Sequence, residues 1–331
     1  MTIRITIVGL GQIGASIGLA LAEHGDMFRR TGHDRNLETA RRAQKMGAID
    51  QVAINLPSAV RESDVILLAV PLEEMRTTLE AIAQDLKEDA VVMDTGPVKV
   101  AMAAWAGELL PEKRHYIGLT PVISPAYLRQ LDSGLEAARP DLFKRGMFAI
   151  VSPPNTSADA LQLAADLTKL LGADLLFADP VELDSLMAAT HLLPQLVAAA
   201  LLNATVDRPG WREARKLAGQ SYAEATAPGA HYSSAKSLSS AVLLNRENVL
   251  RVMDGAISAL QALRDDIQRD DSGSLETHLE NAQLSQARWL KERLAANWAT
   301  EGIPEGVAKS TENYSVLARL FGGGLKRKDR K

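Results

Sequence analysis

The segment Gly9–Gly14, which reads Gly-Leu-Gly-Gln-Ile-Gly, constrains the fold of this chain more than any other. It follows the apolar run 3–8, which is typical of a strand, and it precedes residues 15–22, whose apolar spacing predicts a helix. A Gly-x-Gly-x-x-Gly sequence between a strand and a helix is typical of the turn that binds a dinucleotide. The alternative, a glycine turn in an α/β fold that binds no coenzyme, stays open on the sequence alone.

The residues of this segment have separate expected roles in binding a coenzyme. Gly9 allows the tight turn, and Gly11 lets the backbone approach a pyrophosphate. Gly14 lets the helix lie close to the strand. Gln12 and Ile13 stand in the first helical turn, where backbone amides point at the phosphate charge. We therefore predict that all five residues bind the coenzyme.

An acidic residue follows the next expected strand. Residues 28–33 have strand character and end at Asp34, 20 residues beyond Gly14. A carboxylate at this place hydrogen-bonds the hydroxyls of the adenosine ribose, which favours NAD. Arg35 follows directly, and an arginine there can stack on adenine or bind a 2′-phosphate. The sequence thus predicts NAD or NADP, with NAD favoured by Asp34.

Strands and helices alternate from residue 1 to about residue 180. Further strands are expected at 64–70, 90–94, 116–120, 148–151 and 175–178, with a helix at 157–171 between the last two. This alternation predicts an α/β fold, with an N-terminal Rossmann-type doubly wound parallel sheet over 1–180. Ligands of such sheets bind outside the carboxyl ends of the strands. We therefore expect one crevice to be lined by Gly9, Asp34, Pro71, the segment 94–99 with Thr95, and Thr120, with Val70 and Pro71 against the coenzyme.

Strand signals end near residue 180, and helical spacing replaces them. Helices are expected at 183–206, 212–225, 237–268 and 275–297, which gives an all-helical second domain over 181–320. The first helix should kink at Pro194, because its nitrogen cannot donate to the preceding turn. The stretch 196–202 is apolar all round, which predicts complete burial. A subunit interface would supply that burial, so we expect a homodimer through the C-terminal helices.

Composition argues against several classes of function. The 331 residues carry a net charge of −4 and no cysteine, so neither nucleic-acid binding nor thiolate chemistry is expected. The six histidines lack metal-ligand spacing, and we expect no metal site. No apolar run reaches the ~18 residues that span a bilayer, and the N-terminus has strand character, so we expect a cytoplasmic protein without membrane contact. The basic segment 321–331 should be a flexible tail.

The chain resembles the prephenate/arogenate dehydrogenase family over most of its first 290 residues. The resemblance is carried by residues 9–14 and 34–36, by the segment Asp94–Lys99, by residues 133–143, and by residues 193–199, which are similar to the family's Leu-Pro-His helix. It implies an NAD(P)-dependent oxidoreductase that removes a hydride, with or without decarboxylation, from a small carboxylated substrate. It also implies a helical dimerisation domain.

Four positions depart from the family's pattern. The family's Gly-Gly-His-Pro, whose histidine accepts the proton of the substrate hydroxyl, has Thr120 at the histidine position. The serine of its Asp-x-x-Ser-x-Lys segment is Pro97, and the second histidine of its Leu-Pro-His helix is Gln195. Its Phe-Arg-Asp, which binds a substrate carboxylate, reads 222–224 as Tyr-Ala-Glu. A threonine does not act as a base near neutral pH, so an amino analogue of prephenate or another secondary-metabolite acid is an alternative substrate.

The remaining candidates follow from position and resemblance. We assign Thr120, His191 and Lys99 as the catalytic candidates, the last because a cation in a first helical turn favours an anionic contact. The substrate-binding candidates are Thr95, Gln195, Tyr222 and His231, of which Tyr222 or His231 can replace the missing proton acceptor. A protein of another class, an NAD(P)-binding sensor without turnover, stays as the further alternative.

Overall fold

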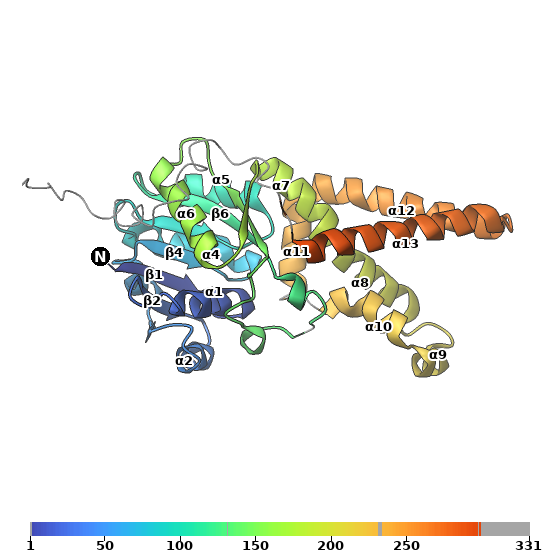
Figure 1. Cartoon of the computed structure of the whole chain (residues 1–331), viewed down its shortest axis with the longest axis horizontal. Helices are drawn as coiled ribbons and strands as arrows, with labels where there is room; N and C mark the ends of the chain where they lie inside the picture. The colour runs from blue at the N-terminus through green and yellow to red at the C-terminus, as the bar shows by residue number, and fades with distance from the viewer. Residues whose placement is uncertain (1, 131, 231–233, 297, 299–331) are drawn as a thin grey trace, which may run out of the picture.

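The computed structural model describes residues 2–130, 132–230, 234–296 and 298. Figure 1 shows a sheet flanked by helices on one side of the molecule and a group of long helices on the other. The basic segment 321–331, predicted as a flexible tail, lies outside the described residues.

The N-terminal part is built on one sheet in the order β3-β2-β1-β4-β5-β6-β7-β8. Its strands are β1 Ile3–Val8, β2 Phe28–His33, β3 Gln51–Val52, β4 Val65–Leu68, β5 Val91–Asp94, β6 His115–Val122, β7 Met147–Val151 and β8 Asp174–Phe177. All pairs are parallel except β6 with β7. The doubly wound parallel sheet predicted from the sequence is confirmed, apart from the antiparallel pair β6 and β7, which was not predicted. β7 runs the other way because the connection 123–146 contains only two short 3-10 turns and no crossover helix.

Helices cover both faces of this sheet. Packed on one face are α1 Gln12–Ala22, α2 Leu37–Lys45 and α6 Ala158–Leu170, and on the other α3 Leu56–Val60, α4 Leu72–Ile82 and α5 Lys99–Leu109. Alternate strand residues supply the two cores, as with Ile7 toward the first and Val8 toward the second. The carboxyl ends of the parallel strands lie together at one edge of the sheet. The strand order reverses beside β1, because β2 and β3 lie on one side of β1 and β4 and the later strands lie on the other.

The C-terminal part is helical, as predicted. Its helices are α7 Pro180–Met187, α8 Leu193–Thr205, α9 Trp211–Leu217, α10 Gln220–Thr226, α11 Ala235–Leu244, α12 Arg246–Gln268 and α13 Ser272–Ala295, with a π-helical turn Ala188–Leu192 before α8 and a 3-10 turn Ala227–Ala230 before α11. The expectation of single helices over 212–225 and 237–268 is wrong. Gly219, in extended backbone, separates α9 from α10, and Asn245 separates α11 from α12.

The kink expected at Pro194 takes the form of the π-helical turn that precedes it. In a π turn each amide bonds the carbonyl five residues back, which lets the chain absorb one extra residue without ending the helix. The amide of Leu193 accordingly donates to the carbonyl of Ala188. The polar residue His191 is therefore presented by an irregular turn rather than by a regular helix.

The helix Pro180–Thr205 corrects two expectations drawn from the sequence. It has 26 residues, and its most apolar 18-residue window has a mean hydropathy of 1.6, so it is long and apolar enough to cross a membrane by length and composition, although no such stretch was expected. In this structure it packs on α5, α10 and α12. The complete burial predicted for 196–202 is also wrong within this chain, since Val197 is 45% exposed and Ala198 is the buried member.

One carboxylate joins the helical part to the sheet. Asp184 of α7 is buried and accepts hydrogen bonds from the backbone amides of Lys99 (2.5 Å) and Val100 (3.1 Å), at the start of α5. The side chain of Asn245 donates to the carbonyl of Asp184 at 2.7 Å. A helix start leaves amides without partners, so α5 receives its cap from the other domain.

We expect Asp184→Ala to lower the free energy of unfolding by about 2–4 kcal/mol, because two buried amides lose their acceptor. Asp179→Ala is the matched control, since Asp179 caps α7 locally at an exposed site, and its loss should cost about 1 kcal/mol. Urea unfolding followed by circular dichroism measures both. Equal losses in the two variants would contradict the interdomain role of Asp184.

Candidate active site

The turn after β1 has the geometry of a phosphate-binding cradle. Gly9 has φ +90°, and a Cβ added at Gly14 would collide with the carbonyl oxygen of Gly9. A Cβ at Gly11 would meet nothing within 4 Å, so the space in front of this residue is open. None of the described side chains caps α1 at Gly11, and its first turn carries no acidic residue. The amides of Gln12, Ile13 and Gly14 are thus available to an anion in that space.

Asp34 is held at the edge of this cradle by two backbone amides. Its Oδ2 accepts from the amide of Leu10 (2.9 Å) and its Oδ1 from the amide of Asn36 (2.9 Å). The carboxylate is therefore fixed between the glycine turn and the start of α2, with lone pairs left for ribose hydroxyls. These observations show that the chain's residues fit the dinucleotide predicted from the sequence. Arg35 does not point freely into this space, because it forms an ion pair with Glu74 of α4.

The other candidates at strand ends lie along the same edge. Val70 and Pro71 follow β4, and Pro71 precedes the first residue of α4. Thr95 follows β5, where its hydroxyl and its amide both donate to the carbonyl of Leu68. The structure therefore places these three residues beside the glycine turn and Asp34, around the carboxyl ends of β1, β2, β4 and β5.

Lys99 is completely buried, and its anionic contact is within the protein. Its Nζ donates to Asp94 Oδ1 (2.7 Å) and to the carbonyl of Leu119 (2.8 Å). The hydroxyl of Tyr116 donates to the other oxygen of Asp94 at 2.6 Å. Burial lowers the pKa of Lys99, against the opposing effect of Asp94, and it raises the pKa of Tyr116 well above its usual value. In this structure Lys99 fixes the end of β6 rather than facing the crevice.

Thr120 stands on β6, immediately after the carbonyl that Lys99 binds. It is 3% exposed, and its Oγ1 has no hydrogen-bond partner among the described residues. Its side chain lies on the same face of the sheet as Tyr116, toward the helical part, because residues of a strand alternate in direction. The position of the family's histidine thus carries a small, buried hydroxyl that can exchange hydrogen bonds but is a poor base.

His191 is the candidate proton acceptor that lies on the helical part. It lies on the π-helical turn, whose Ala188 and Leu192 pack into the same apolar cluster as Leu72 and Val98 at the starts of α4 and α5. His191 is exposed to solvent, and its ring has no hydrogen-bond partner in the described part of the chain. The surrounding protein nevertheless lowers the pKa of His191 below its ordinary value by desolvation. A neutral imidazole has a free ring nitrogen that can take a proton.

Gln195 is buried, and its side chain hydrogen-bonds the backbone of the π-helical turn. Its Nε2 donates to the carbonyl of His191 at 2.9 Å, beside Pro194, which has no N–H to give. The sequence predicted that His191 and Gln195 share one helix face, but the π turn lies between them. His191 is exposed, whereas Gln195 is only 8% exposed. Gln195 thereby fixes the backbone that presents His191.

Tyr222 is not brought together with these residues. Its hydroxyl hydrogen-bonds Thr205 at 2.8 Å and its ring contacts Trp211. Thr205 ends α8, about 18 Å along the helix from Leu193 at roughly 1.5 Å per residue. Within one subunit Tyr222 is therefore far from His191. The candidate His231 lies outside the described residues.

The sequence reasoning missed several residues that position the site. Tyr116, Asp184 and Asn245 carried no motif, and their partners are 20 or more positions away in the chain. Asp94 was recognised only as part of a segment. Among the described residues, no group of three or more acidic, histidine or cysteine side chains has the arrangement of a metal site.

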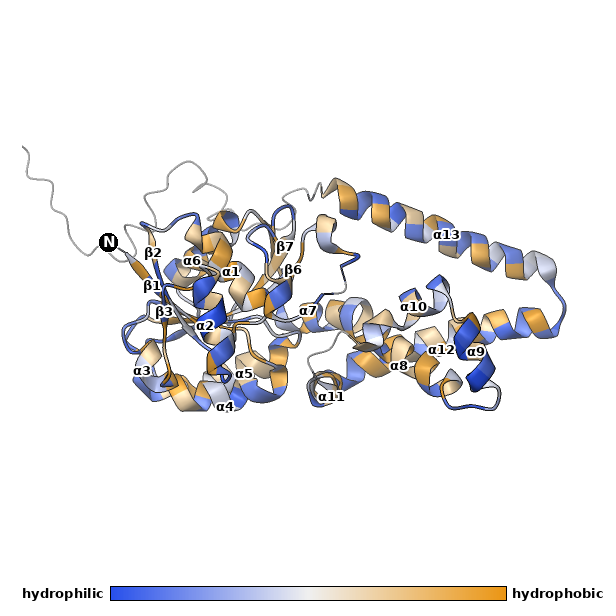
Figure 2. Cartoon of the chain, turned by 90° about the horizontal axis from the view of Figure 1, so that it is seen from below, coloured by the Kyte–Doolittle hydropathy of each residue, from blue (hydrophilic) through white to orange (hydrophobic). Residues whose placement is uncertain are grey.

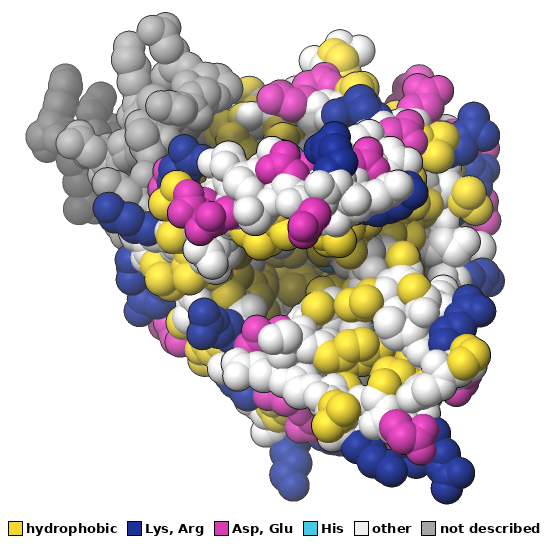
Figure 3. Space-filling view, turned by 90° about the vertical axis from the view of Figure 1, so that its right-hand side faces the viewer, with side chains coloured by type: hydrophobic (Ala, Val, Ile, Leu, Met, Phe, Trp, Pro, Cys, Tyr) yellow, Lys and Arg dark blue, Asp and Glu magenta, His cyan; other side chains and the backbone are white. Residues whose placement is uncertain are grey.

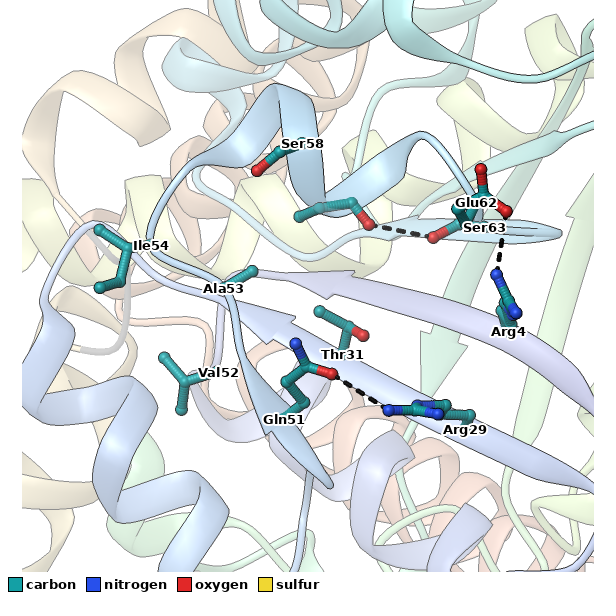
Figure 4. Close-up of a pocket in the computed structure, with 11 residues that line it drawn as sticks. Arg4, Arg29, Thr31, Gln51, Val52, Ala53, Ile54, Ser58, Glu62 and Ser63 are labelled. Carbon is teal, nitrogen blue, oxygen red and sulfur yellow. Dashed lines mark hydrogen bonds and ion pairs between the residues drawn. The ribbon is translucent and has the colours of Figure 1, made fainter.

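Figure 4 shows a pocket that belongs to a different part of the sheet. Arg4, Arg29 and Gln51 line it from β1, β2 and β3, and Glu62 lines it from the segment after α3. Arg4 pairs with Glu62 at 3.0 Å. None of the candidate site residues borders this pocket, so it does not enter the function argued below.

Comparison with known proteins identifies the family. A model of the nucleotide-binding domain of prephenate dehydrogenase matches residues 17–177, and a model of the dimerization domain of prephenate dehydrogenase matches residues 179–281. The chain belongs to the prephenate dehydrogenase family. Membership makes it an NAD(P)-dependent oxidoreductase of the prephenate dehydrogenase type. The glycine turn precedes the first matched residue, so its assignment rests on the geometry above.

Individual relatives agree with this family. The chain is 26% identical to the prephenate dehydrogenase of Bacillus subtilis, over 84% of this chain and 74% of that protein. It is 27% identical to the cyclohexadienyl dehydrogenase of Zymomonas mobilis, over 86% of this chain and 94% of that protein. The crystal structure of prephenate dehydrogenase from A. aeolicus with hydroxyphenyl propionate and NAD+ superposes with a TM-score of 0.76 at 23% identity, over 87% of this chain and 98% of that one. At that identity the structural match supports the fold alone.

Proposed function

We propose that this protein oxidises a small carboxylated substrate of the prephenate type with NAD, and that His191 accepts the proton. The observation that carries this proposal is the position of His191 on the π-helical turn, whose Ala188 and Leu192 pack into one apolar cluster with Leu72 and Val98 at the starts of α4 and α5. NAD, when bound, supplies the acceptor for a hydride. The glycine turn and Asp34 hold it at the carboxyl edge of the sheet.

The residues of the chain divide the remaining work. An alcohol loses a hydride from carbon and a proton from oxygen, and a positioned base raises the rate by about 10²–10⁴. His191 takes that proton. Thr120 and Thr95 are the substrate-side hydroxyls at the ends of β6 and β5, and Gln195 fixes the turn that carries His191.

An amino analogue of prephenate is the second candidate substrate, and Thr120 favours it. The lone pair of a neutral amine supports departure of the hydride, with formation of a C=N bond, before any proton has to leave. A site that carries threonine in place of the family's histidine meets that lower demand. The two candidates therefore differ in their dependence on His191.

A panel of prephenate, arogenate and aminodeoxyprephenate tests the reaction. We expect absorbance of reduced nicotinamide to rise with NAD and at least one of the three. If the protein binds NAD but oxidises none of the three compounds, the proposed reaction is wrong, and an NAD(P)-binding sensor without turnover becomes the favoured function. Activity on the amino analogue alone would favour the second candidate.

His191→Asn separates the two candidates through the pH profile. Because desolvation holds the pKa of His191 below 6.5, kcat/KM for an alcohol should rise with pH through that lowered pKa and then level off. In His191→Asn the rise with pH should disappear, and kcat for the alcohol should fall about 10²–10⁴-fold. The rate of amine oxidation by the same variant should change little. His115→Asn, at the opposite end of β6, is the control. An unchanged profile for the alcohol in His191→Asn would refute the assignment.

We further propose a homodimer through the C-terminal helices. The matched family model is a dimerization domain, and only 22% of the most apolar window of helix Pro180–Thr205 is buried within the chain. Figure 3, which views the helical end, shows a hollow lined with apolar side chains, and Figure 2 shows apolar residues along α8. Exposed apolar residues on α12 recur at Leu250, Ile257, Leu260 and Ile267, a spacing that suits packing against another helix. The cytoplasmic location expected from the sequence stays a prediction.

Leu260→Glu should convert a dimer into a monomer, because Leu260 is 63% exposed on this stripe and a buried carboxylate is costly. Ile54→Glu, at an apolar residue of the sheet domain that is 75% exposed, is the matched control and should remain dimeric. Sedimentation velocity at micromolar concentration gives the masses. A monomeric natural protein, or a folded dimer of Leu260→Glu, would contradict the proposed interface.

A further inference from the structure

Arg35 follows the acidic residue of the coenzyme site, where an arginine is suited to a 2′-phosphate. In this structure its guanidinium forms an ion pair with Glu74, in the first turn of α4. The pair links the end of β2 to the helix after β4, beside the cradle formed by the glycine turn and Asp34. The arginine side chain itself remains 79% exposed, so no packing fixes it elsewhere.

We propose that Glu74 sets the coenzyme preference toward NAD by holding Arg35, the residue after Asp34, in an ion pair that places a second carboxylate at this arginine. This inference rests on the coenzyme site of the proposed function. Glu74 lies near the N-terminal end of α4, where the helix dipole favours a negative charge. Asp34 is fixed by two amides. A 2′-phosphate would therefore meet two carboxylates and an arginine that is already neutralised.

The ribose of NAD carries a hydroxyl at this position and has no phosphate charge to repel. Asp34 accepts hydrogen bonds from that hydroxyl, as its fixed orientation allows. Removing the charge of Glu74 would leave Arg35 with no acidic partner of its own and would lower the repulsion. Loss of the Glu74 charge should thus raise the affinity for NADPH through Arg35. This effect should be smaller at high salt, because the Arg35–Glu74 pair is exposed.

The test is the ratio of dissociation constants for NADPH and NADH, measured by fluorescence titration of the full-length protein. In the natural protein NADH should bind more tightly. Glu74→Gln should lower the NADPH-to-NADH ratio about three- to tenfold, in the range of one exposed charge pair plus a removed repulsion. The matched control is Glu80→Gln, also on α4 but paired with Arg76, which should leave the ratio unchanged. Thermal melting checks that each variant is folded.

The double variant Arg35→Ala/Glu74→Gln shows whether the effect passes through the arginine. We expect the gain in NADPH affinity to disappear in it. The inference is overturned if Glu74→Gln leaves the ratio unchanged, if the gain survives without Arg35, or if the natural protein prefers NADPH. If neither nucleotide binds the natural protein, the coenzyme site of the proposed function fails as well, and the two failures are thereby distinguished.

Discussion

The burial of one ammonium group underlies both the site and the junction of the two domains. Lys99 is fully enclosed, and a buried charge is tolerated only when partners offset the loss of water. Asp94 supplies the opposite charge, and the carbonyl of Leu119 supplies a further acceptor. The lysine stem lies against Gly118, where an added Cβ would come within 2.9 Å of it. Glycine at this position thus allows the lysine to reach the end of β6.

The same residue carries the connection to the helical domain through its backbone. The amides of Lys99 and Val100 begin α5, and both bind Asp184 of α7. Asn245, between α11 and α12, in turn holds the carbonyl of Asp184. One short segment therefore orders the strand end on one side and three helices on the other.

The sequence predicts what is local and leaves out what is long-range. The glycine turn, the strands and the switch to helices at Pro180 follow from spacing and turn chemistry within a few residues. For Lys99 the sequence predicted an anionic partner but did not identify it. The hydrogen-bond partners of Asp184 lie 84 and 85 residues away along the chain, beyond the reach of a local pattern. The sequence also did not predict the π turn before Pro194 or the exposure of α8. The spacing of apolar residues indicates a helix, but it shows neither a change of helix register nor which neighbours cover the apolar side chains.

The chemistry proposed for this chain depends on that junction more than it would if the proton acceptor stood on the sheet. Thr120 belongs to β6, in the same rigid layer as the glycine turn. His191 belongs to the helical part, and its turn meets the sheet domain through Ala188 and Leu192. In the proposed reaction, the distance between the coenzyme and His191 would therefore be set by packing between domains. Because a displacement of about 1 Å at a reacting centre costs as much as 10²-fold in rate, the buried Asp184 cap and the Lys99 pair would constrain that reaction as well as folding.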